Sequence, residues 1–256
     1  MVVGAVLAVP LAGKDPLAMV ARPYLWPGTD MAHPLGTDML GRDLLAGILH
    51  GARFSLLIGL AAGLLAALFG LLVGSVAGYC GGAIDALLMR VTDIFQTMPS
   101  LVFTIVLVVI LRPTVGSIVL GIAVTSWPNI ARLVRAEALR LRHSEFVQAA
   151  AVQGLGDLRI IGIHILPNVL SPAVVMASIL VGHAILTEAS LSFLGLGDPN
   201  IASWGSMIGS GREVLRTAWY MTAIPGVAIF LTVIALNLIG NALNDLLNPR
   251  HRGSLP

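Results

Sequence analysis

Charge is the scarcest property of this sequence. Only 11% of its 256 residues are Asp, Glu, Lys or Arg, whereas about 25% is usual for a soluble domain. Lys14 is the only lysine and Cys80 the only cysteine, so an intrachain disulfide and a cysteine zinc cluster are both excluded. A phosphate-binding loop needs Gly-Lys followed by Ser or Thr, and here Lys14 is followed by Asp15. If ATP drives this protein, another chain must bind the nucleotide.

The residues that are abundant are apolar. Hydrophobic residues make up 57% of the chain, and the mean hydropathy is +0.91. The apolar runs are continuous rather than alternating, which favours membrane-spanning helices over a β-barrel. The arginines cluster beside these runs, a pattern typical of membrane topology and not of nucleic-acid binding. The sequence therefore predicts an all-α, multi-pass integral membrane protein.

Six transmembrane helices are expected in a single domain covering residues 1–256. We expect the spans at about 1–12, 54–79, 94–111, 115–131, 169–193 and 219–240. The first run is shorter than the ~20 residues needed to cross a bilayer, so we interpret it as the outer end of a truncated helix. The stretch CGGAIDALLMRVTD after the second span is expected to be a short return loop. Dense arginines place the 132–168 loop on the cytoplasmic side.

The second span carries glycines at four-residue spacing. Gly70, Gly74 and Gly78 fall on one helical face, where they would let another helix approach closely. The sequence does not say which helix that is.

Two later spans contain polar residues at membrane depth. His183 and Glu188 are candidates for contact with substrate or protons, the alternative being structural pairing. His183 and Thr187 are four residues apart and could share a hydrogen bond. Asn237 and Asn241 lie along one stripe of the last span and favour helix packing over pore lining. Neither a metal site nor a catalytic constellation is predicted.

Residues 145–168 form a polar island between apolar runs. Apolar positions 146, 147, 150 and 151 share one face of a short helix, which Gly154 would end in a left-handed conformation. Asp157 is expected to cap a second helix and Pro167 to end it. The segment would then project as a compact knob, unless it is a connector with no partner.

Within this island the residues resemble the EAA loop of ATP-binding-cassette (ABC) importer permeases. The similarity rests on Ala149-Ala150, on Gly154 and on Leu166-Pro167, while Gln148 replaces a usual glutamate and His164 a usual isoleucine. Four more stretches resemble the DppC/OppC-type subunits of the peptide branch of that family. They are HPLGTDMLGRD with GARFSLLIG, GYCGGAIDALLMRVTDIF, LTEASLSFLGLGDPNIASWGSMI and PGVAIFLTVIALNLIGNALNDLLNPR.

The resemblance implies the transmembrane domain of a type I ABC importer and a non-catalytic permease subunit for di- or oligopeptides in the bacterial plasma (inner) membrane. The implied partners are a homologous DppB/OppB-like permease, two ABC ATPase subunits that bind ATP and Mg²⁺, an extracytoplasmic substrate-binding protein and membrane lipid. No cofactor is expected in this chain. The implied ATPase-coupling residues are Glu145, Gln148, Ala149, Ala150, Gly154, Asp157, Leu166 and Pro167.

Other interpretations remain open at this point. Within the same family the substrate could be a nickel chelate, glutathione or haem. A more distant alternative is an ion- or proton-coupled secondary transporter, for which His183 and Glu188 would have to supply the coupling groups.

Overall fold

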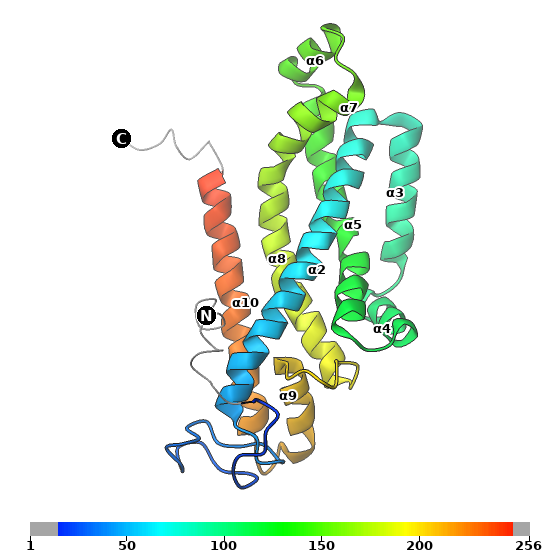
Figure 1. Cartoon of the computed structure of the whole chain (residues 1–256). Helices are drawn as coiled ribbons and strands as arrows, with labels where there is room; N and C mark the ends of the chain where they lie inside the picture. Colours follow the sequence, from blue (N-terminus) through cyan, green and yellow to red (C-terminus); the bar gives the residue numbers. More distant parts are fainter. Residues whose placement is uncertain (1–14, 248–256) are drawn as a thin grey trace, which may run out of the picture. The chain divides into compact units, whose positions relative to one another are not determined.

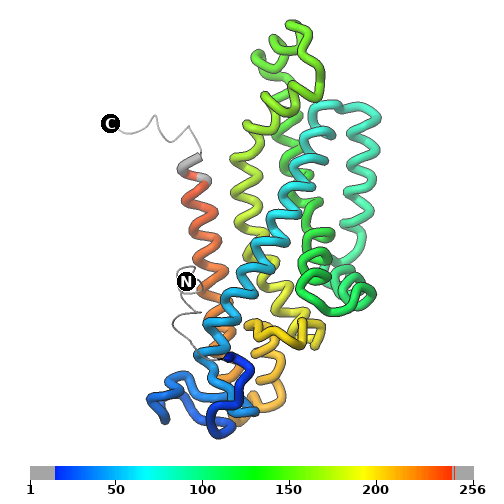
Figure 2. Tube along the Cα trace, viewed as in Figure 1, coloured from blue at the N-terminus to red at the C-terminus, as the bar shows by residue number. Residues whose placement is uncertain are grey.

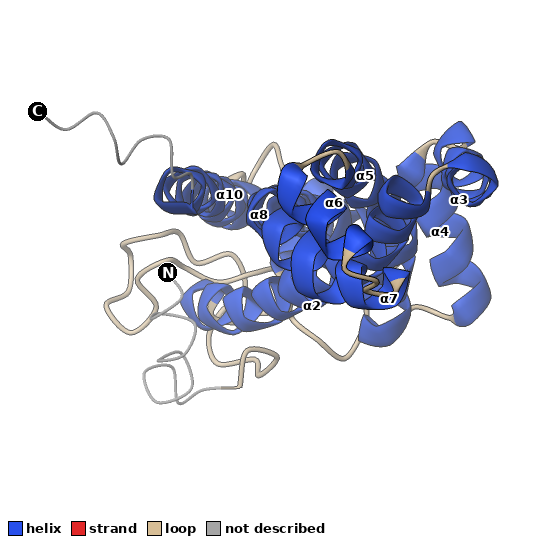
Figure 3. Ribbon diagram, turned by 90° about the horizontal axis from the view of Figure 1, so that it is seen from above, coloured by secondary structure: helices blue, strands red, loops and turns tan. Residues whose placement is uncertain are grey.

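The computed structural model describes residues 15–247, and every regular element in this range is helical (Figures 1 and 3). Two isolated β-bridges, Met19 with Arg42 and Thr37 with Asp43, organise the segment before the first long helix. The helices are α2 (Leu44–Cys80), α3 (Gly82–Thr97), α4 (Ser100–Leu111), α5 (Val115–Arg142), α6 (Glu145–Val152), α7 (Asp157–Ile160), a π-helical turn (Ile161–Ile165), α8 (Leu166–Phe193), α9 (Trp204–Gly211), a 3-10 turn (Arg212–Val214) and α10 (Tyr220–Leu247).

Four helical stretches in this range are long and apolar enough to cross a membrane. They are Leu44–Cys80, Val115–Arg142, Asp157–Phe193 and Tyr220–Leu243, and the bent pair α3 and α4 would make a fifth. The expected span at 1–12 lies outside the described residues, as do Lys14 and the basic end of the chain after residue 247. The all-helical membrane fold is confirmed.

The expected return loop after the second span is wrong, because Gly82–Thr97 is a helix. Gly81 and Gly82 have φ of 67° and 53°, so the chain reverses within two residues that tolerate the left-handed region. Met98 is extended because Pro99 follows it, and α3 and α4 meet there at 86°. The apolar run 94–111 is therefore two helices and not one straight span.

The chain divides into two compact units. The first contains the described residues up to Leu60, with Ile105–Val119 and Gly182–Ala235. The second contains Ala61–Thr104, Leu120–Val181 and the described residues from Leu236. The tube in Figure 2 lets the reader follow how the chain passes between these ranges.

In the second unit, the core is a seam between α2 and α5. A Cβ on Gly70 would lie 2.7 Å from Ile130 Cβ, and one on Gly78 would lie 2.6 Å from Ala138 Cβ. The predicted close approach is thus to α5, whose Ile130, Val134 and Ala138 are fully buried. Trp127 adds edge-on ring contacts with Phe69 and Phe95, at centroid distances of 4.9 and 5.4 Å.

In the first unit, two buried aromatic residues join distant segments. Trp204 at the start of α9 donates its Nε1 hydrogen to the Ile48 carbonyl of α2 at 3.0 Å. Tyr220 at the start of α10 donates its hydroxyl to the Thr37 carbonyl at 3.2 Å. Both side chains are about 1% exposed, so these bonds satisfy polar atoms inside the core.

Candidate functional site

The helix α6 ends in a Schellman motif centred on Gly154. The Leu155 amide donates to the Ala150 carbonyl at 3.2 Å, and the Gly154 amide donates to the Ala151 carbonyl at 3.0 Å. Gly154 has φ of 82°, as predicted from its position after an amphipathic stretch. Leu155 packs against the same core cluster as Ala150, which is the apolar contact usual in this motif.

Two apolar residues of α6 fix it to the second unit. Val147 and Ala150 are buried in a cluster with Val134 and Ala138 of α5 and with Ile160 and Ile165, which follow the loop. Of the four apolar positions predicted for this face, Phe146 and Ala151 remain exposed. The inward face of α6 is therefore narrower than the sequence pattern indicated, and it rests on small side chains.

The outward face of the loop is exposed and carries apolar residues. Val152 is 89% and Leu158 86% exposed, while Phe146 lies beside the His164 ring at a centroid distance of 6.1 Å. Glu145, Gln148 and Ala149 share this exposed surface. In Figure 1, α6 and α7 extend beyond the ends of α5 and α8 within the second unit. Apolar side chains in such a position suit contact with another protein.

Asp157 does not cap the second helix as predicted. Gly156 occupies the capping position without a side-chain bond, and Asp157 is the first residue of α7. The Asp157 carboxylate instead accepts a hydrogen bond from the Tyr79 hydroxyl at 3.1 Å, which ties the loop to the end of α2. Together with Arg142 and Gln148, these side chains line a recess of about 410 Å³ beside α6.

The expectation that Pro167 ends a helix is also wrong. The helix is continuous from Asp157 to Phe193, with Leu166 and Pro167 in its interior. Residues Ile161–Ile165 form a π-helical turn just before the proline. Such a wide turn leaves room for the proline ring. It also tolerates the loss of the backbone hydrogen bond that proline cannot donate. Asn168 also donates its side-chain amide to the His164 carbonyl at 2.7 Å.

The polar residues of the fifth span pair with nearby hydroxyl groups. Glu188 is 1% exposed and accepts hydrogen bonds from Ser192 at 2.8 Å and Ser55 at 3.4 Å. His183 is exposed, and Thr187 donates to its carbonyl at 2.9 Å, with a 3.4 Å contact to Nδ1. Structural pairing therefore describes Glu188 in this conformation. Asn237 and Asn241 of α10 are both exposed.

Several residues of the site carry no signal in the sequence. Asp85 of α3 and Arg135 of α5 form a bidentate ion pair, with 2.6 Å between Arg135 Nη2 and Asp85 Oδ2, although they are 50 positions apart. Arg132 also pairs with Asp93, through one contact of 2.6 Å between two exposed side chains. Opposite charges flanking the second and fourth predicted spans were the available hint, since buried charges need partners. Nothing in the sequence around Tyr79, at the end of α2, indicates that its hydroxyl bonds to Asp157.

Comparison with known proteins identifies the family. Residues 70–253, well over half of the chain, match the family described as "Binding-protein-dependent transport system inner membrane component". The chain belongs to this family. It is an inner-membrane permease component of a binding-protein-dependent transport system, and the resemblance found in the sequence is confirmed.

The relatives of this permease include named peptide permeases. It is 43% identical over 234 residues to the "Dipeptide transport system permease protein DppC" of Escherichia coli K12, covering 91% of this chain and 78% of that protein. It is 41% identical over 217 residues to the "Di/tripeptide transport system permease protein DppC" of Pseudomonas aeruginosa, covering 84% and 72%.

Solved structures agree on the fold of this permease. A chain of the MetNI methionine ABC transporter in inward-facing conformations matches with a TM-score of 0.68, covering 80% of this chain and 98% of that chain. A chain of an amino acid ABC transporter matches with a TM-score of 0.61, covering 80% and 95%. The identities are 16% and 14%, so these matches show the type I ABC importer fold alone.

Proposed function

We propose that this permease imports di- or oligopeptides. The observation that carries the proposal is its 43% identity, over 91% of the chain, to a permease named for dipeptide transport. The stretches that resembled the peptide branch extend from His33 to Arg250, so the similarity is not confined to the loop shared by the wider family. Nickel chelates, glutathione and haem are the competing substrates.

The work of transport would come from other chains. Two ABC ATPase subunits would bind ATP and Mg²⁺, a homologous permease would complete the pathway, and an extracytoplasmic protein would deliver substrate. The lack of a Gly-Lys-Ser/Thr loop in this sequence supports this division. The permease would then be non-catalytic and need no cofactor of its own.

The exposed face of α6 and α7 would receive the ATPase. Its apolar residues Phe146, Val152 and Leu158 supply contact area, and Gln148 and Ala149 lie on the same exposed surface. Movement of this face would reach the membrane directly, because α6 follows α5 after two residues and α7 continues into α8. Nucleotide bound by the ATPase would thereby shift the population between inward-facing and outward-facing states.

Reconstitution into vesicles tests the substrate. The complete transporter should accumulate labelled dialanine when ATP is supplied on the ATPase side, and omission of ATP should abolish accumulation. Unlabelled glutathione, haem and a nickel chelate are offered as competitors. A transporter that ignores dialanine and accumulates one of the competitors would overturn the peptide assignment while leaving the permease family intact.

An uncoupler separates ATP-driven import from ion-coupled transport. With ATP held constant, dissipation of the proton gradient should leave dialanine uptake unchanged. Collapse of uptake under that condition would contradict the proposed coupling through α6.

A further inference from the structure

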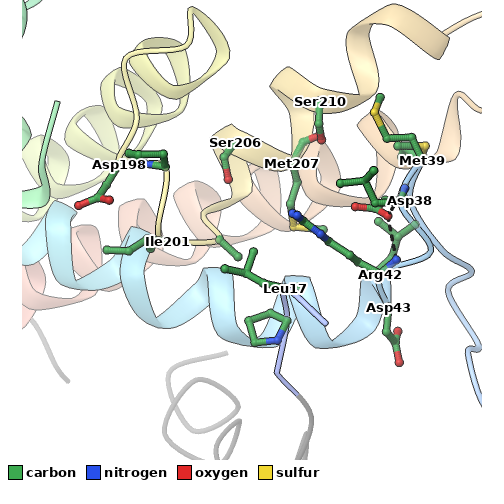
Figure 4. A pocket seen from close by; sticks show the side chains of 17 residues that line it. Leu17, Asp38, Met39, Arg42, Asp43, Asp198, Ile201, Ser206, Met207 and Ser210 are labelled. Atoms are coloured by element: carbon green, nitrogen blue, oxygen red, sulfur yellow. Dashed lines mark hydrogen bonds between the residues drawn. The ribbon is translucent and has the colours of Figure 1, made fainter. Parts of the chain in front are cut away.

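The first unit contains a recess that the proposed coupling does not use. It has a volume of about 170 Å³ and is lined by Pro16 and Leu17, by residues of the 38–47 segment, by Asp198–Met207 and Ser210, and by Met221 (Figure 4). About 10–15 Å³ of such space holds one water, so the recess has room for a small solute. It lies within the first unit.

Arg42 is the cationic residue in the lining of this recess. Its side chain extends from the end of the 36–43 segment toward Met207 and Ser206 of α9 (Figure 4). The Nε atom is buried and has no hydrogen-bond partner, and the guanidinium makes no ion pair within residues 15–247. Arg42 as a whole is half-buried, and its Nε is the atom that lies away from solvent without a partner. A buried polar atom without a partner is unusual, because nothing offsets the cost of its desolvation.

The acidic residues around Arg42 are engaged with other groups. Asp38 accepts backbone hydrogen bonds from Leu40 and Arg42, both at 2.8 Å (Figure 4). Asp43 pairs with His33 at 3.1 Å. Asp198 accepts from the backbone and side chain of Asn200, at 3.0 and 3.3 Å. None of these carboxylates forms an ion pair with the Arg42 guanidinium within residues 15–247.

We propose that this recess binds the carboxylate group of a small solute, with Arg42 as its charged partner. A guanidinium offers two parallel donors that match a carboxylate. The Ser206 and Ser210 hydroxyls lie in the same lining and donate to the Ser203 and Met207 carbonyls, each at 2.9 Å. Leu17, Met39, Ile201 and Met207 supply apolar walls for the rest of the ligand. The proposed function suggests that this solute is a peptide. The choice of a peptide rests on that function, whereas the carboxylate site itself does not.

Binding to the intact transporter in nanodiscs tests the site. Dialanine is the probe and acetate is the competitor. Dialanine C-terminal amide, which keeps the amino group but lacks the carboxylate, is the matched control. Arg42→Gln should weaken dialanine binding about tenfold or more, as expected for loss of a charge-assisted pair. The amide should bind weakly to both proteins, and acetate should displace dialanine from the unsubstituted one.

A matched variant controls for the removal of a positive charge. Arg216 is exposed in the same unit, so Arg216→Gln should bind dialanine as the unsubstituted protein does. Ser210→Met, which narrows the recess without altering a charge, should also weaken binding. Equal binding of dialanine and its amide, or unchanged binding in Arg42→Gln, would overturn the site.

The same experiment distinguishes this site from the transport function. Uptake of dialanine into vesicles with no effect of Arg42→Gln on binding would refute the recess and leave peptide import standing. Arg42-dependent binding of acetate and dialanine without ATP-driven uptake would support the recess and refute peptide import.

Discussion

Gly154 determines where the chain turns between α6 and α7. Its φ of 82° is unfavourable for a side chain by about 1–2 kcal/mol, yet a Cβ placed there would meet no atom within 4 Å. Any effect of an alanine at this position therefore comes from backbone conformation and not from collision within the chain.

We expect Gly154→Ala to reduce ATP-driven uptake and Gly154→Trp to abolish it, with membrane insertion unchanged in both. Gly156 is the matched control, because its Cβ would also lie in open space but its φ is −70°. Gly156→Ala should transport normally. Insertion is measured by quantifying the protein in isolated membranes, and normal uptake by Gly154→Trp would exclude the assigned role of this turn.

Glu188 joins two helices of the first unit through serine hydroxyls. Ser55 lies on α2, and Ser192 lies on the same helix as Glu188. Removal of the carboxylate leaves buried donors without an acceptor, which costs about 1–3 kcal/mol.

Accordingly, Glu188→Ala should lower the melting midpoint of the purified transporter in detergent, and Glu188→Gln should lower it less because the amide can still accept and donate. His183→Ala serves as the control, since His183 is exposed one turn away. Melting is followed by tryptophan fluorescence. Equal midpoints for Glu188→Ala and the unsubstituted protein would contradict a structural role for the carboxylate.

At the scale of elements, the seam between α2 and α5 is the tightest contact of the second unit. A Cβ at Gly74 would lie 2.5 Å from the Ala131 carbonyl oxygen and 3.0 Å from the Arg135 amide nitrogen. Backbone atoms of a helix cannot move aside as a flexible side chain can, so the two helices would have to separate.

Gly74→Ala should therefore destabilise the protein by about 1–3 kcal/mol, the usual cost of overpacking. The control is Gly116→Ala near the start of α5, where the nearest atom to the Cβ is Thr114 Oγ1 at 3.9 Å. That variant should be neutral or slightly stabilising, because alanine favours a helix more than glycine does. The yield of folded protein after detergent extraction distinguishes the two variants.

The elements also show where sequence reasoning succeeds. Continuous apolar runs predicted the long helices α2, α5, α8 and α10, and the Gly154 turn followed from a helix-ending glycine. They did not predict α3, which was expected to be a return loop, or α9, which lies between two expected spans. The last part of α5 and the first residues of α8 were missed because the helix there continues beyond the apolar run, where hydropathy no longer marks it. The Asp85–Arg135 pair and the partners of Glu188 arise only when segments far apart in the chain come together.

At the scale of the whole molecule, the helices differ in how much surface they leave for lipid and partners. The most apolar window of the α5 span is 72% buried, whereas that of the α10 span is 28% buried. An α10 span that is apolar and little covered suits a membrane environment or another permease subunit. The orientation of the chain in the membrane is given by which of its loops face the cytoplasm.

Single cysteines test that sidedness, since Cys80 is the only native thiol. In a Cys80→Ser background, we expect Thr29→Cys to react with an impermeant maleimide in intact spheroplasts. Gln153→Cys should react only after lysis, and less when the ATPase subunits are present. Both positions are exposed, so access to the reagent decides the result. Labelling of Gln153→Cys in intact spheroplasts would reverse the proposed topology.

The π-helical turn at Ile161–Ile165 changes the rotational position of the residues before it relative to α8. A turn of this type contains one residue more than an α-helical turn, and each α-helical residue corresponds to about 100° of rotation. Everything before it, including Leu158 and Arg159, is therefore rotated about the axis relative to an uninterrupted helix. Deletion of Gly162 would restore α-helical geometry and turn the exposed face of α6 and α7 by roughly a quarter of a circle.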